Sequence, residues 1–407
     1  MDIKKLIELI NEGLPSDIDN ILNSSVEVNI NELQNLKKQF PLFPWPEILT
    51  QKDLRQKAHL KFHSPQQKLF TSKGLQQASS LALAEYHYQK SLNAFSIADL
   101  CCGIGADLIA LAQHKEKVYA LDIDEETLLC AQYNCRHLSQ IEFLKQPAED
   151  FNQRIDLIFA DPDRRPDSRR SLDPETMSPP LSALLQLFFT QKLAPRLLLK
   201  LAPALDYKVL EKKYFSPLGI YPTSGFHWEF ISENGVLKEI LLCLEESDVS
   251  AKRQAILLPG NHTLSGSGLE KIAVSGWQEF LFEPDNAIIR AGLVQKIGTD
   301  LGYQILDPHI ALLTGKIPVS SKFGKTYRIL EHFPWNLKHL KKYFKQHAVG
   351  ELIIKTRGFP LTAEKILSEF KLQGTNRMII VIVRIGSQHQ VAVLEPEKDL
   401  TCKESAL

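Results

Sequence analysis

The sequence predicts an α/β fold in which helices cover both faces of a parallel sheet, with a helical segment before this sheet and a smaller α/β region after it. Short apolar strands alternate with helical stretches through the middle of the 407 residues, which is the pattern of a doubly wound sheet. A Gly-x-Gly turn follows the first of these strands, and an aspartate ends the second. These two features indicate that a ligand binds where the strands end.

Composition limits the class of protein. The chain has 48 Lys and Arg against 48 Asp and Glu, so no overall charge favours nucleic acid or a membrane as partner. Its six cysteines form neither a CxxC pair nor a zinc-type spacing with histidine, so we expect no metal and no disulfide framework. The N-terminus lacks the apolar core of a signal peptide, and no run approaches the ~20 apolar residues of a membrane span. We therefore expect a cytoplasmic protein without a membrane partner.

Residues 1–64 are predicted to form a helical segment. Apolar residues recur there at three- and four-residue steps, for example Ile3, Leu6 and Ile10, until a proline cluster at 40–48 interrupts them. The next domain is expected to span 65–248, and it begins with a helical stretch at 70–92. The strands predicted in it are residues 96–100, 117–123, 141–146, 155–161 and 197–202.

The end of this domain is predicted to be an antiparallel hairpin over 225–245, because two strand-like runs flank the turn Ser-Glu-Asn-Gly. A Gly- and Ser-rich linker with some strand follows at 249–278, and α/β alternation then resumes. The expected C-terminal parts are a small ferredoxin-like connecting subdomain at 279–321, a second α/β domain at 322–395 and a tail at 396–407.

The turn after the first strand, Asp-Leu-Cys-Cys-Gly-Ile-Gly at 99–105, favours a nucleoside ligand. Glycines at such a junction let the backbone approach a ligand, and the free N–H groups of the helix start are partly positive. Asp122 follows about twenty residues later, where a carboxylate can accept hydrogen bonds from ribose hydroxyls. The turn lacks both the third glycine of the dinucleotide motif and a Gly-Lys-Ser/Thr for phosphates, so S-adenosylmethionine fits better than NAD or ATP.

Three stretches, IADLCCGIGADLIALA, VYALDIDEETLLCAQYN and IDLIFADPDRRP, resemble in order and spacing the first, second and fourth motifs of class I S-adenosylmethionine-dependent methyltransferases. More narrowly, DPDRRPDSRRSLDPETMSPPLS, FLFEPDNAIIRAGLVQKIG and ELIIKTRG are similar to bacterial methyltransferases with a THUMP-like C-terminal domain. The resemblance covers residues 65–395. It implies a seven-stranded Rossmann-like sheet with an antiparallel final strand, S-adenosylmethionine as cofactor, a THUMP-like domain at 322–395 and RNA as substrate.

The resemblance also assigns residues to the cofactor. Cys101 stands where the first glycine of the motif is usual, and Pro147 stands where the third motif commonly has an acidic residue. Asp124 is expected to cap the helix that follows it. The residues expected to bind S-adenosylmethionine are Asp99, Cys101, Gly103, Gly105, Asp122, Ile123, Ala148, Lys73 and Gln77.

The fourth motif assigns catalysis to Asp161, with Pro162 fixing the turn that presents it. In amino-methyltransferases a second proline and an aromatic residue follow, and the base stacks on the aromatic ring; here Asp163 and Arg164 replace them, which argues against N-methylation of a base. Methylation at carbon 5 of uracil needs a thiolate nucleophile, and the next strand end offers Lys200 and no cysteine. A ribose 2′-O reaction with Asp161 and Lys200 as two polar members stays open.

Basic residues indicate where a substrate strand binds. Guanidinium groups directly after the catalytic turn suit phosphates, although arginines that pair with nearby aspartates in a solvated loop are the alternative. Residues 321–380 contain twelve Lys or Arg against four Asp or Glu, and we interpret this excess as an RNA-binding face and not only as an ordinary lysine-rich surface. The residues expected to contact the substrate are Arg164, Arg165, Lys341, Lys342, Lys355 and Arg357.

Three functions are compatible with these observations. The first is an RNA methyltransferase in which Asp161 positions the acceptor and the C-terminal domain binds RNA. The second is a methyltransferase of a small molecule or a protein, which the missing aromatic residue after Pro162 supports. The third is a cofactor-binding RNA-binding module without catalysis, which the irregular first, third and fourth motifs support. No oligomeric state is predicted.

Overall fold

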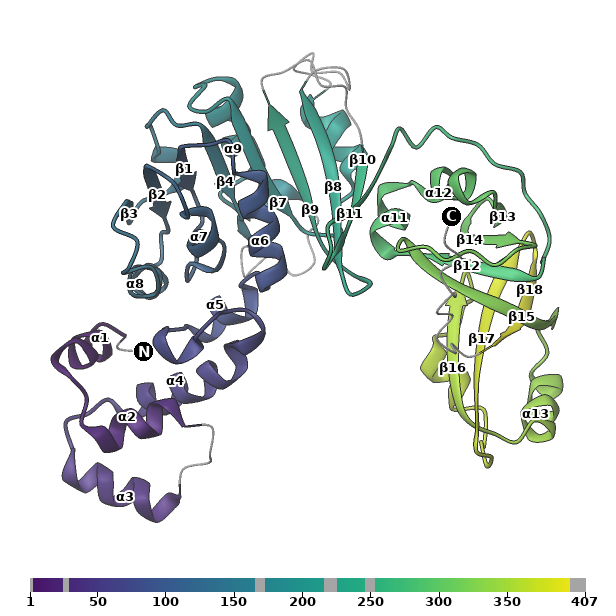
Figure 1. Ribbon diagram of the computed structural model, residues 1–407, viewed down its shortest axis with the longest axis horizontal. Coiled ribbons are helices and arrows are strands. Elements are labelled where there is room, and N and C mark those ends of the chain that lie inside the picture. The colour runs from purple at the N-terminus through teal and green to yellow at the C-terminus, as the bar shows by residue number, and fades with distance from the viewer. Residues whose placement is uncertain (1–2, 25–28, 165–172, 216–224, 246–252, 396–407) are drawn as a thin grey trace, which may run out of the picture. The chain divides into compact units, whose positions relative to one another are not determined.

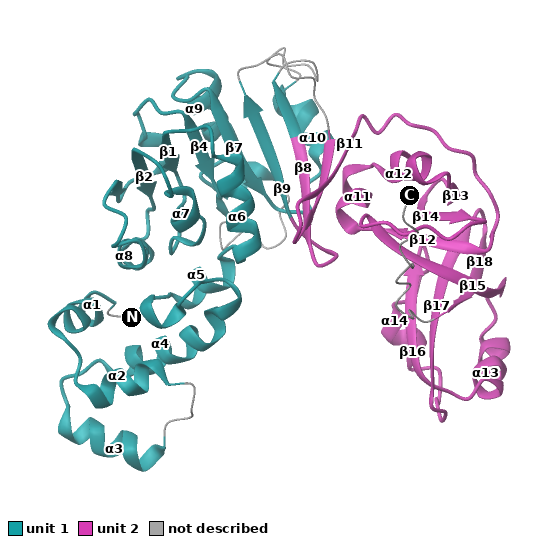
Figure 2. Cartoon of the chain, in the orientation of Figure 1, with its two compact units in different colours: residues 1–227, 239–251 teal, residues 228–238, 252–407 magenta. Residues whose placement is uncertain are grey.

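The computed structural model describes residues 3–24, 29–164, 173–215, 225–245 and 253–395 of the chain. The chain divides into two compact units, coloured separately in Figure 2: unit 1 comprises residues 1–227 and 239–251, and unit 2 comprises residues 228–238 and 252–407. Among the described residues, no helix combines the length and the apolar character that crossing a bilayer requires.

Unit 1 contains the predicted α/β sheet. Its hydrogen-bonded order is β9-β7-β4-β1-β2-β3. All neighbouring pairs are parallel except β9, which runs antiparallel to β7. Figure 1 shows α6 and α7 lying across one face of this sheet. The strands are β1 (Ser96–Asp99), β2 (Lys117–Leu121), β3 (Ile141–Leu144), β4 (Leu157–Ala160), β7 (Arg196–Leu201) and β9 (Val236–Glu245).

The remaining elements of the domain follow the predicted alternation. β8 (Phe226–Glu233) precedes β9, and the turn between them uses Asn234 and Gly235 at positive φ, as in a tight hairpin. β8 through β3 give the seven strands with an antiparallel last strand that were expected, so the predicted fold class is confirmed. Beyond β8, β10 (Arg253–Leu258) and β11 (His262–Gly266) extend the same sheet to nine strands among the described residues. The helices after the first strand are α7 (Ala106–Leu111), α8 (Glu125–Asn134), α9 (Leu181–Phe189) and α10 (Tyr207–Leu210).

The central strands are apolar along their whole length because both of their faces are covered. Every residue of β4 is buried, as are Leu197, Leu198 and Leu199 of β7. Such continuous apolar runs are typical of a parallel sheet between helix layers. The polar groups of these central strands therefore lie at the strand ends, where the candidate site lies.

The N-terminal segment is helical, as predicted, and it shares a core with the sheet domain. Ile48 and Phe70 pack in the same buried cluster as Ile104 of the Gly-x-Gly turn and Tyr133 of α8. The predicted helix over 70–92 is divided in two, because residues 78–80 leave the helix between α5 and α6. The helices are α1 (Ile3–Glu12), α2 (Ser16–Asn23), α3 (Ile30–Gln39), α4 (Trp45–Lys57), α5 (Ser72–Gln77) and α6 (Leu81–Lys90).

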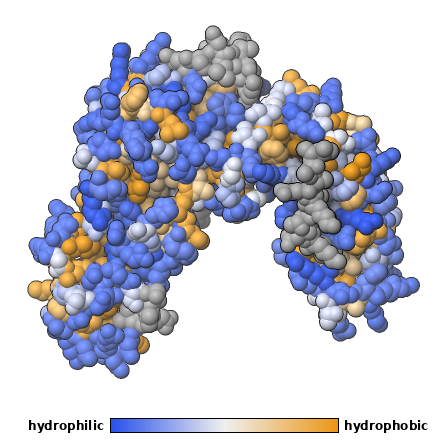
Figure 3. Space-filling view, in the orientation of Figure 1, coloured by the Kyte–Doolittle hydropathy of each residue, from blue (hydrophilic) through white to orange (hydrophobic). Residues whose placement is uncertain are grey.

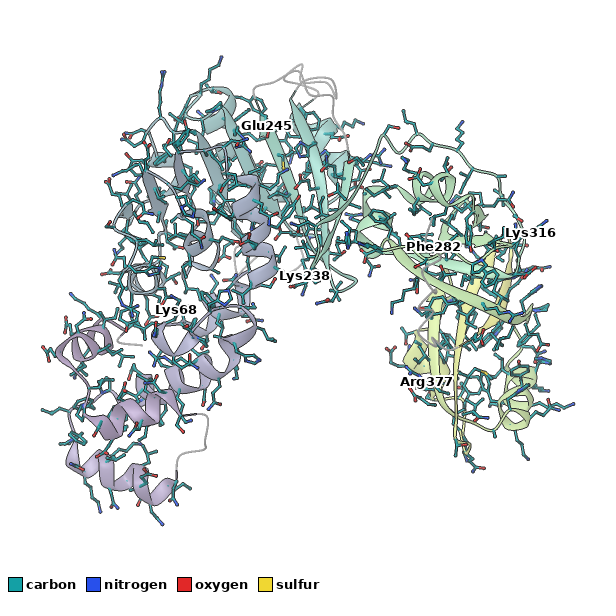
Figure 4. All side chains as sticks on the ribbon, viewed as in Figure 1. Lys68, Lys238, Glu245, Phe282, Lys316 and Arg377 are labelled. Atoms are coloured by element: carbon teal, nitrogen blue, oxygen red, sulfur yellow. The ribbon has the colours of Figure 1, made fainter. Side chains whose placement is uncertain are left out.

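Asn134, at the end of α8, fixes the N-terminal segment to the turn. Its buried amide accepts a hydrogen bond from the Leu69 N–H (2.8 Å) and donates to the carbonyls of Leu69 and Ile104 (2.9 Å each). Lys68, labelled in Figure 4, adds a bond from its ammonium to the Asn134 carbonyl (3.0 Å). One side chain thus satisfies three buried backbone groups on two separate segments.

In unit 2, β10 (Arg253–Leu258) runs parallel to β8 and antiparallel to β11 (His262–Gly266). A seven-stranded sheet follows, in the order β13-β14-β12-β15-β18-β17-β16. Its elements are β12 (Phe280–Pro284), α11 (Asn286–Ala291), α12 (Val294–Leu301), β13 (Gln304–Asp307), β14 (Ile310–Gly315), β15 (Gly324–Pro334), α13 (Leu337–Gln346), β16 (Val349–Arg357), α14 (Ala363–Leu367), β17 (Asn376–Ile385) and β18 (Gln388–Leu394).

The long strand β15 joins the two expected C-terminal parts. Its first half pairs with β12, beside the buried Phe282 that Figure 4 labels, and its second half pairs with β18. The segments 279–321 and 322–395 therefore share one sheet. On the C-terminal part of this sheet, α13 buries Leu340 and Phe344 against strand residues such as Ile380.

We predict that Asn134→Leu lowers the free energy of unfolding by about 3 kcal/mol, because three buried backbone groups lose their partner. Urea unfolding measures this change. Asn93→Leu makes the same substitution at an exposed position, and it is expected to change the free energy by less than about 0.5 kcal/mol. Equal effects of the two substitutions would contradict this role of Asn134.

Candidate functional site

A cavity of about 690 Å³ lies in unit 1, over the carboxyl ends of the central parallel strands. Asp99 ends β1, Asp122 follows β2 and Asp161 follows β4, and all three line the cavity. Open α/β sheets bind their ligands at this edge, and the volume is in the range of small-molecule sites. Further lining comes from α5 and the residues next to it, from the Gly-x-Gly turn, from the first turns of α7 and α8, from Asp163 and from residues 147–149 and 178–179.

The Gly-x-Gly turn has the backbone conformation that required glycine. Gly103 and Gly105 have φ values of 55° and 90°, which other L-residues rarely adopt. The Gly103 N–H donates to Asp122 Oδ2 (3.1 Å), so the turn and the second strand end are joined. Cys101, in place of the usual first glycine, donates its N–H to Asp99 Oδ1 (3.3 Å). Its side chain is accommodated at the cavity wall.

Asp122 and Asp124 have different tasks. Asp124 accepts the Thr127 N–H (2.8 Å) and caps α8, as expected. Asp122 accepts the Asp124 N–H on Oδ1 (2.9 Å) and faces the cavity, and burial raises the pKa of its carboxyl. Beside it, Ile123 is 60% exposed. A carboxylate next to an exposed apolar side chain suits a ribose and the face of its base.

Across the cavity, Ala148 lies in a short 3-10 turn with the neighbouring residues 149–150. Its side chain is buried, and together with Pro147 and Glu149 it lines the cavity. Gly105 does not line the cavity; it stands as the N-cap of α7, where a Cβ would lie 3.3 Å from Cys135 Sγ. Gly105 thus sets the close packing of α7 against α8.

The charge of the cavity indicates the charge of its ligand. Among the described residues, eight carboxyl side chains and one lysine line it, so it favours a cation and disfavours phosphates. S-adenosylmethionine carries a positive sulfonium and no phosphate, so the residues present fit it and do not fit NAD or ATP. The charged lining residues are Lys73, Asp99, Asp107, Asp122, Asp124, Glu126, Glu149, Asp161 and Asp163.

Helix α5 closes one side of the cavity. Lys73 Nζ lies 2.6 Å from Asp163 Oδ2, and Gln77 Nε2 donates to Asp163 Oδ1 (2.7 Å). A Cβ on Gly74 would lie 2.4 Å from Ile104 Cγ2, so only glycine allows this helix to approach the turn so closely. Lys73 and Gln77, which were expected to bind the cofactor, line the cavity, but their polar ends bind Asp163.

Lys200, at the end of β7, is the centre of a buried charged network. Its ammonium donates to Asp161 Oδ2 (2.5 Å), Ser79 Oγ (2.8 Å) and Asp107 Oδ2 (3.2 Å), and it lies 3.8 Å from Glu239 Oε2. The Lys200 side chain is 8% exposed, whereas that of Asp161 is 38% exposed. Asp161 is therefore much more exposed to the cavity than the lysine that binds it.

His87 of α6 forms the far end of the network. Its ring nitrogens lie 2.8 Å from Asp107 Oδ1 and 2.7 Å from Glu239 Oε1. Burial alone would lower the pKa of His87, but the two carboxylates outweigh it and raise the pKa to about 10. The ring is therefore a cation at neutral pH, and it balances part of the charge of Asp107 and Glu239.

The charge states of the other members follow from the same surroundings. Burial opposes a charged lysine, but Asp107, Asp161 and Glu239 hold the pKa of Lys200 well above its usual value. For Asp161, the enclosed surroundings outweigh Lys200 and raise the carboxyl pKa. Burial also places the pKa of Asp99 and of the Cys101 thiol well above their ordinary values. The Cys101 thiol is therefore protonated at neutral pH.

Sequence analysis did not identify Ser79, His87, Asp107 or Glu239 as site residues. Asp107 carried a local signal, because it stands in the apolar run Ala-Asp-Leu-Ile-Ala-Leu of a short helix. A charged residue on a buried helix face requires a partner. His87 and Glu239 carried no such signal, because they meet over a separation of 152 residues.

The structure places the remaining predicted residues as follows. Pro162 is buried behind Asp161 and does not line the cavity. Arg164 belongs through its backbone to β5 (Asp163–Arg164), which pairs with β6 (Met177–Ser178). Arg165 lies outside the described residues.

The predicted RNA-contacting residues of unit 2 fall into two groups. Lys341 and Lys342 are exposed on α13, and Lys341 Nζ lies 3.7 Å from Glu369 Oε2. Lys355 and Arg357 at the end of β16 both bind Glu283 of β12, the latter at 2.9 Å. A phosphate must therefore compete with Glu283 for Lys355 and Arg357. Among the described residues, Lys341 and Lys342 have no partner closer than Glu369.

Comparison with known proteins gives matches over both parts of the chain. A family of methyltransferase domains matches residues 97–163, and a family described as THUMP domain-like matches residues 324–396. An uncharacterized S-adenosylmethionine-dependent methyltransferase of Mycobacterium tuberculosis is 26% identical over 324 residues, which cover 78% of this chain and 85% of the relative.

A solved structure has the same fold along its whole length. It is that of a protein named as a candidate methyltransferase from Porphyromonas gingivalis W83, with 18% identity and a TM-score of 0.75. The alignment covers 98% of this chain and all of the other. This likeness extends the shared fold from the sheet domain to the C-terminal domain.

We predict that the protein loses stability as the pH rises above neutrality, because His87 is protonated in the folded state and neutral in the unfolded state. The interaction is fully present below the unfolded pKa of about 6.5, and it is lost as the pH rises through the folded value of about 10. Within this window the free energy of unfolding falls by about 1.4 kcal/mol per pH unit.

Urea unfolding between pH 7 and 9 measures this slope, and NMR of labelled histidine reports the protonation of the ring directly. In His87→Gln the contribution disappears, so the slope becomes shallower. A neutral His87 ring at pH 8 in the wild-type protein would contradict the prediction.

Proposed function

The chain is an S-adenosylmethionine-dependent methyltransferase with a THUMP-like C-terminal domain, and on this basis we propose that it methylates RNA. Two features together carry the proposal. The cavity, which Asp161 lines, is acidic, and α13 of the THUMP-like part is exposed and basic. The cavity suits the cofactor, and the helix suits a polyanion.

The residues proposed to hold the cofactor surround the first and second strand ends. The turn at Gly103 would approach its methionine part, Asp122 would accept the ribose hydroxyls, and Ile123 and Ala148 would flank the adenine. When bound, S-adenosylmethionine supplies an electrophilic methyl group on its sulfonium. Since the lining is acidic, it also stabilises the positive charge of this group.

Asp161 is proposed to bind and orient the acceptor. Its Oδ2 is held by Lys200, and its carboxylate is open to the cavity. The described lining of the cavity is polar, whereas a small apolar substrate would need a narrow apolar pocket. The lining therefore favours a polar acceptor. Pro162, behind the carboxylate, fixes the backbone from which Asp161 projects.

The C-terminal domain is proposed to hold the RNA. Lys338, Lys341, Lys342 and Lys345 are exposed on α13, while Leu340 and Phe344 of the same helix face the core. In the space-filling view of Figure 3, the surface over this end of unit 2 is mostly hydrophilic. Lysines on one helix face provide a sequence-independent contact to phosphates.

We predict that the protein transfers radiolabelled methyl groups from S-adenosylmethionine to RNA from cells that lack the gene. Asp161→Asn should lower this transfer by about 10²- to 10⁴-fold, because it removes the group that accepts the proton, without weakening cofactor binding. Asp122→Ala should weaken cofactor binding itself, which calorimetry measures.

Asp53→Asn is the matched control for Asp161→Asn, because Asp53 is an exposed residue of α4 and is expected to change nothing. Label that enters only proteins or small molecules would contradict the RNA proposal. Absence of transfer to every fraction, with cofactor binding intact, would favour a non-catalytic module instead.

We predict that the double substitution Lys341→Glu and Lys342→Glu weakens RNA binding and leaves cofactor affinity unchanged. If each lysine contacts one phosphate, the slope of log affinity against log salt falls by about 2. Filter binding at several salt concentrations measures it. Lys316→Glu, at an exposed site of unit 2 outside the matched THUMP-like residues, is the control. An unchanged RNA affinity in the double variant would remove α13 from the binding face.

A further inference from the structure

The acceptor side of the cavity shows which atom it is built to methylate. Three features of the described residues bear on this choice: the single open oxygen of Asp161, the hydrogen bonds that occupy the polar groups beside it, and the lack of aromatic side chains on which a nucleobase can stack. Each concerns described residues of unit 1 alone.

Asp161 presents one oxygen to an acceptor. Its Oδ2 accepts the bond from Lys200 Nζ, and among the described residues nothing donates to Oδ1. The ammonium also binds Ser79 and Asp107 and is 8% exposed, so it holds the carboxylate in one orientation. Oδ1 is therefore a fixed hydrogen-bond acceptor at the cavity wall.

The neighbouring groups are not available as bases or nucleophiles. Both oxygens of Asp163 are taken by Lys73 and Gln77. Both oxygens of Asp107 are taken by His87, Ser79 and Lys200. Lys200 is held as an ammonium by its three carboxylates. Of the described carboxylates bonded to Lys200 or to α5, Asp161 is thus the one with an oxygen open to take a proton from an acceptor.

The thiols that line the cavity do not provide a second route. Burial and nearby carboxylates hold the pKa of the Cys101 and Cys102 thiols well above the ordinary value, so both are protonated. Carbon methylation of a pyrimidine through a covalent adduct requires a thiolate. The described lining therefore offers no thiolate for methylation at a ring carbon.

The described lining also lacks an aromatic surface on which a nucleobase could stack. No Phe, Tyr, Trp or His is found among the described residues of the cavity wall. Enzymes that act on a base extrude it and hold it by stacking on aromatic or apolar side chains. Here the position next to Pro162 is Asp163, which is fixed by α5. A ribose hydroxyl needs no such surface, because it lies at the edge of an RNA strand and is reached without extruding the base.

We propose that the group methylated at this cavity is a hydroxyl oxygen and, resting on the proposed RNA function, that it is a ribose 2′-hydroxyl. The hydroxyl oxygen attacks the methyl carbon of S-adenosylmethionine, so that the O–C bond forms as the S–C bond breaks. The sulfur keeps the electron pair and leaves as neutral S-adenosylhomocysteine. The hydroxyl proton passes to Oδ1 of Asp161 and from there to solvent.

Alkaline hydrolysis of the labelled RNA tests this proposal. Alkali cleaves RNA through the free 2′-hydroxyl, so a 2′-O-methyl nucleotide survives within a dinucleotide, whereas a methylated base is released in a mononucleotide. RNA from cells lacking the gene is labelled with the wild-type protein and tritiated S-adenosylmethionine, hydrolysed and separated by size. We expect the label in dinucleotides, and its loss with Asp161→Asn but not with Asp53→Asn.

The possible outcomes separate this inference from the function on which it rests. Label in RNA mononucleotides would keep the RNA methyltransferase and overturn the hydroxyl acceptor. Label in dinucleotides that persists in Asp161→Asn would overturn Asp161 as the proton acceptor. Label in no RNA fraction would overturn the proposed function itself.

Discussion

The ion pair between Lys200 and Asp161 is the interaction on which the candidate site depends. An ammonium cannot be buried at the end of a strand unless carboxylates replace its hydration. Asp161, Asp107 and Glu239 do so from three different elements, and His87 balances two of them from a fourth. The network therefore ties helices α6 and α7 to strands β7 and β9, and it leaves one carboxylate oxygen at the cavity. Breaking one pair would leave the other charges buried without compensation.

Although the net charge of the chain is zero, two of its surfaces carry opposite local charges. The cavity of unit 1 is acidic, which suits a sulfonium and excludes phosphate-bearing cofactors. The exposed side of α13 in unit 2 is basic, which suits the phosphates of a nucleic acid. The local charge of each surface therefore favours a different ligand in each unit, which the equal numbers of acidic and basic residues in the whole chain do not reveal.

The sequence was sufficient for the features that depend on local pattern. Apolar runs such as residues 157–160 predicted the strands. The turn at Gly103 and Asp122 were assigned to one ligand site from their spacing, and in the structure a hydrogen bond joins them. Asp124 was expected to cap α8 and does so, because a capping side chain bonds within its own turn. These features require no knowledge of how distant segments pack.

The features that the sequence did not reveal depend on contacts between distant segments. In the sequence, nothing distinguishes His87 and Glu239 from other helix and strand residues, because their contact forms only in the folded chain. Lys355 and Arg357 read as a basic pair, but β12 supplies Glu283 as their partner. Likewise β15 is long enough to serve both expected C-terminal parts, so their shared sheet was not visible from element order alone.

A double-mutant cycle between Lys200 and Asp161 tests most directly the claim that Lys200 acts by holding Asp161. Single-turnover methyl transfer is compared for Lys200→Met, Asp161→Asn and the double variant, with cofactor affinity measured in each to show that the cavity is intact. The account predicts that the double variant is no slower than Asp161→Asn alone, because Lys200 has no separate role once the carboxylate is gone. Losses that add in the double variant, with cofactor affinity preserved, would contradict it.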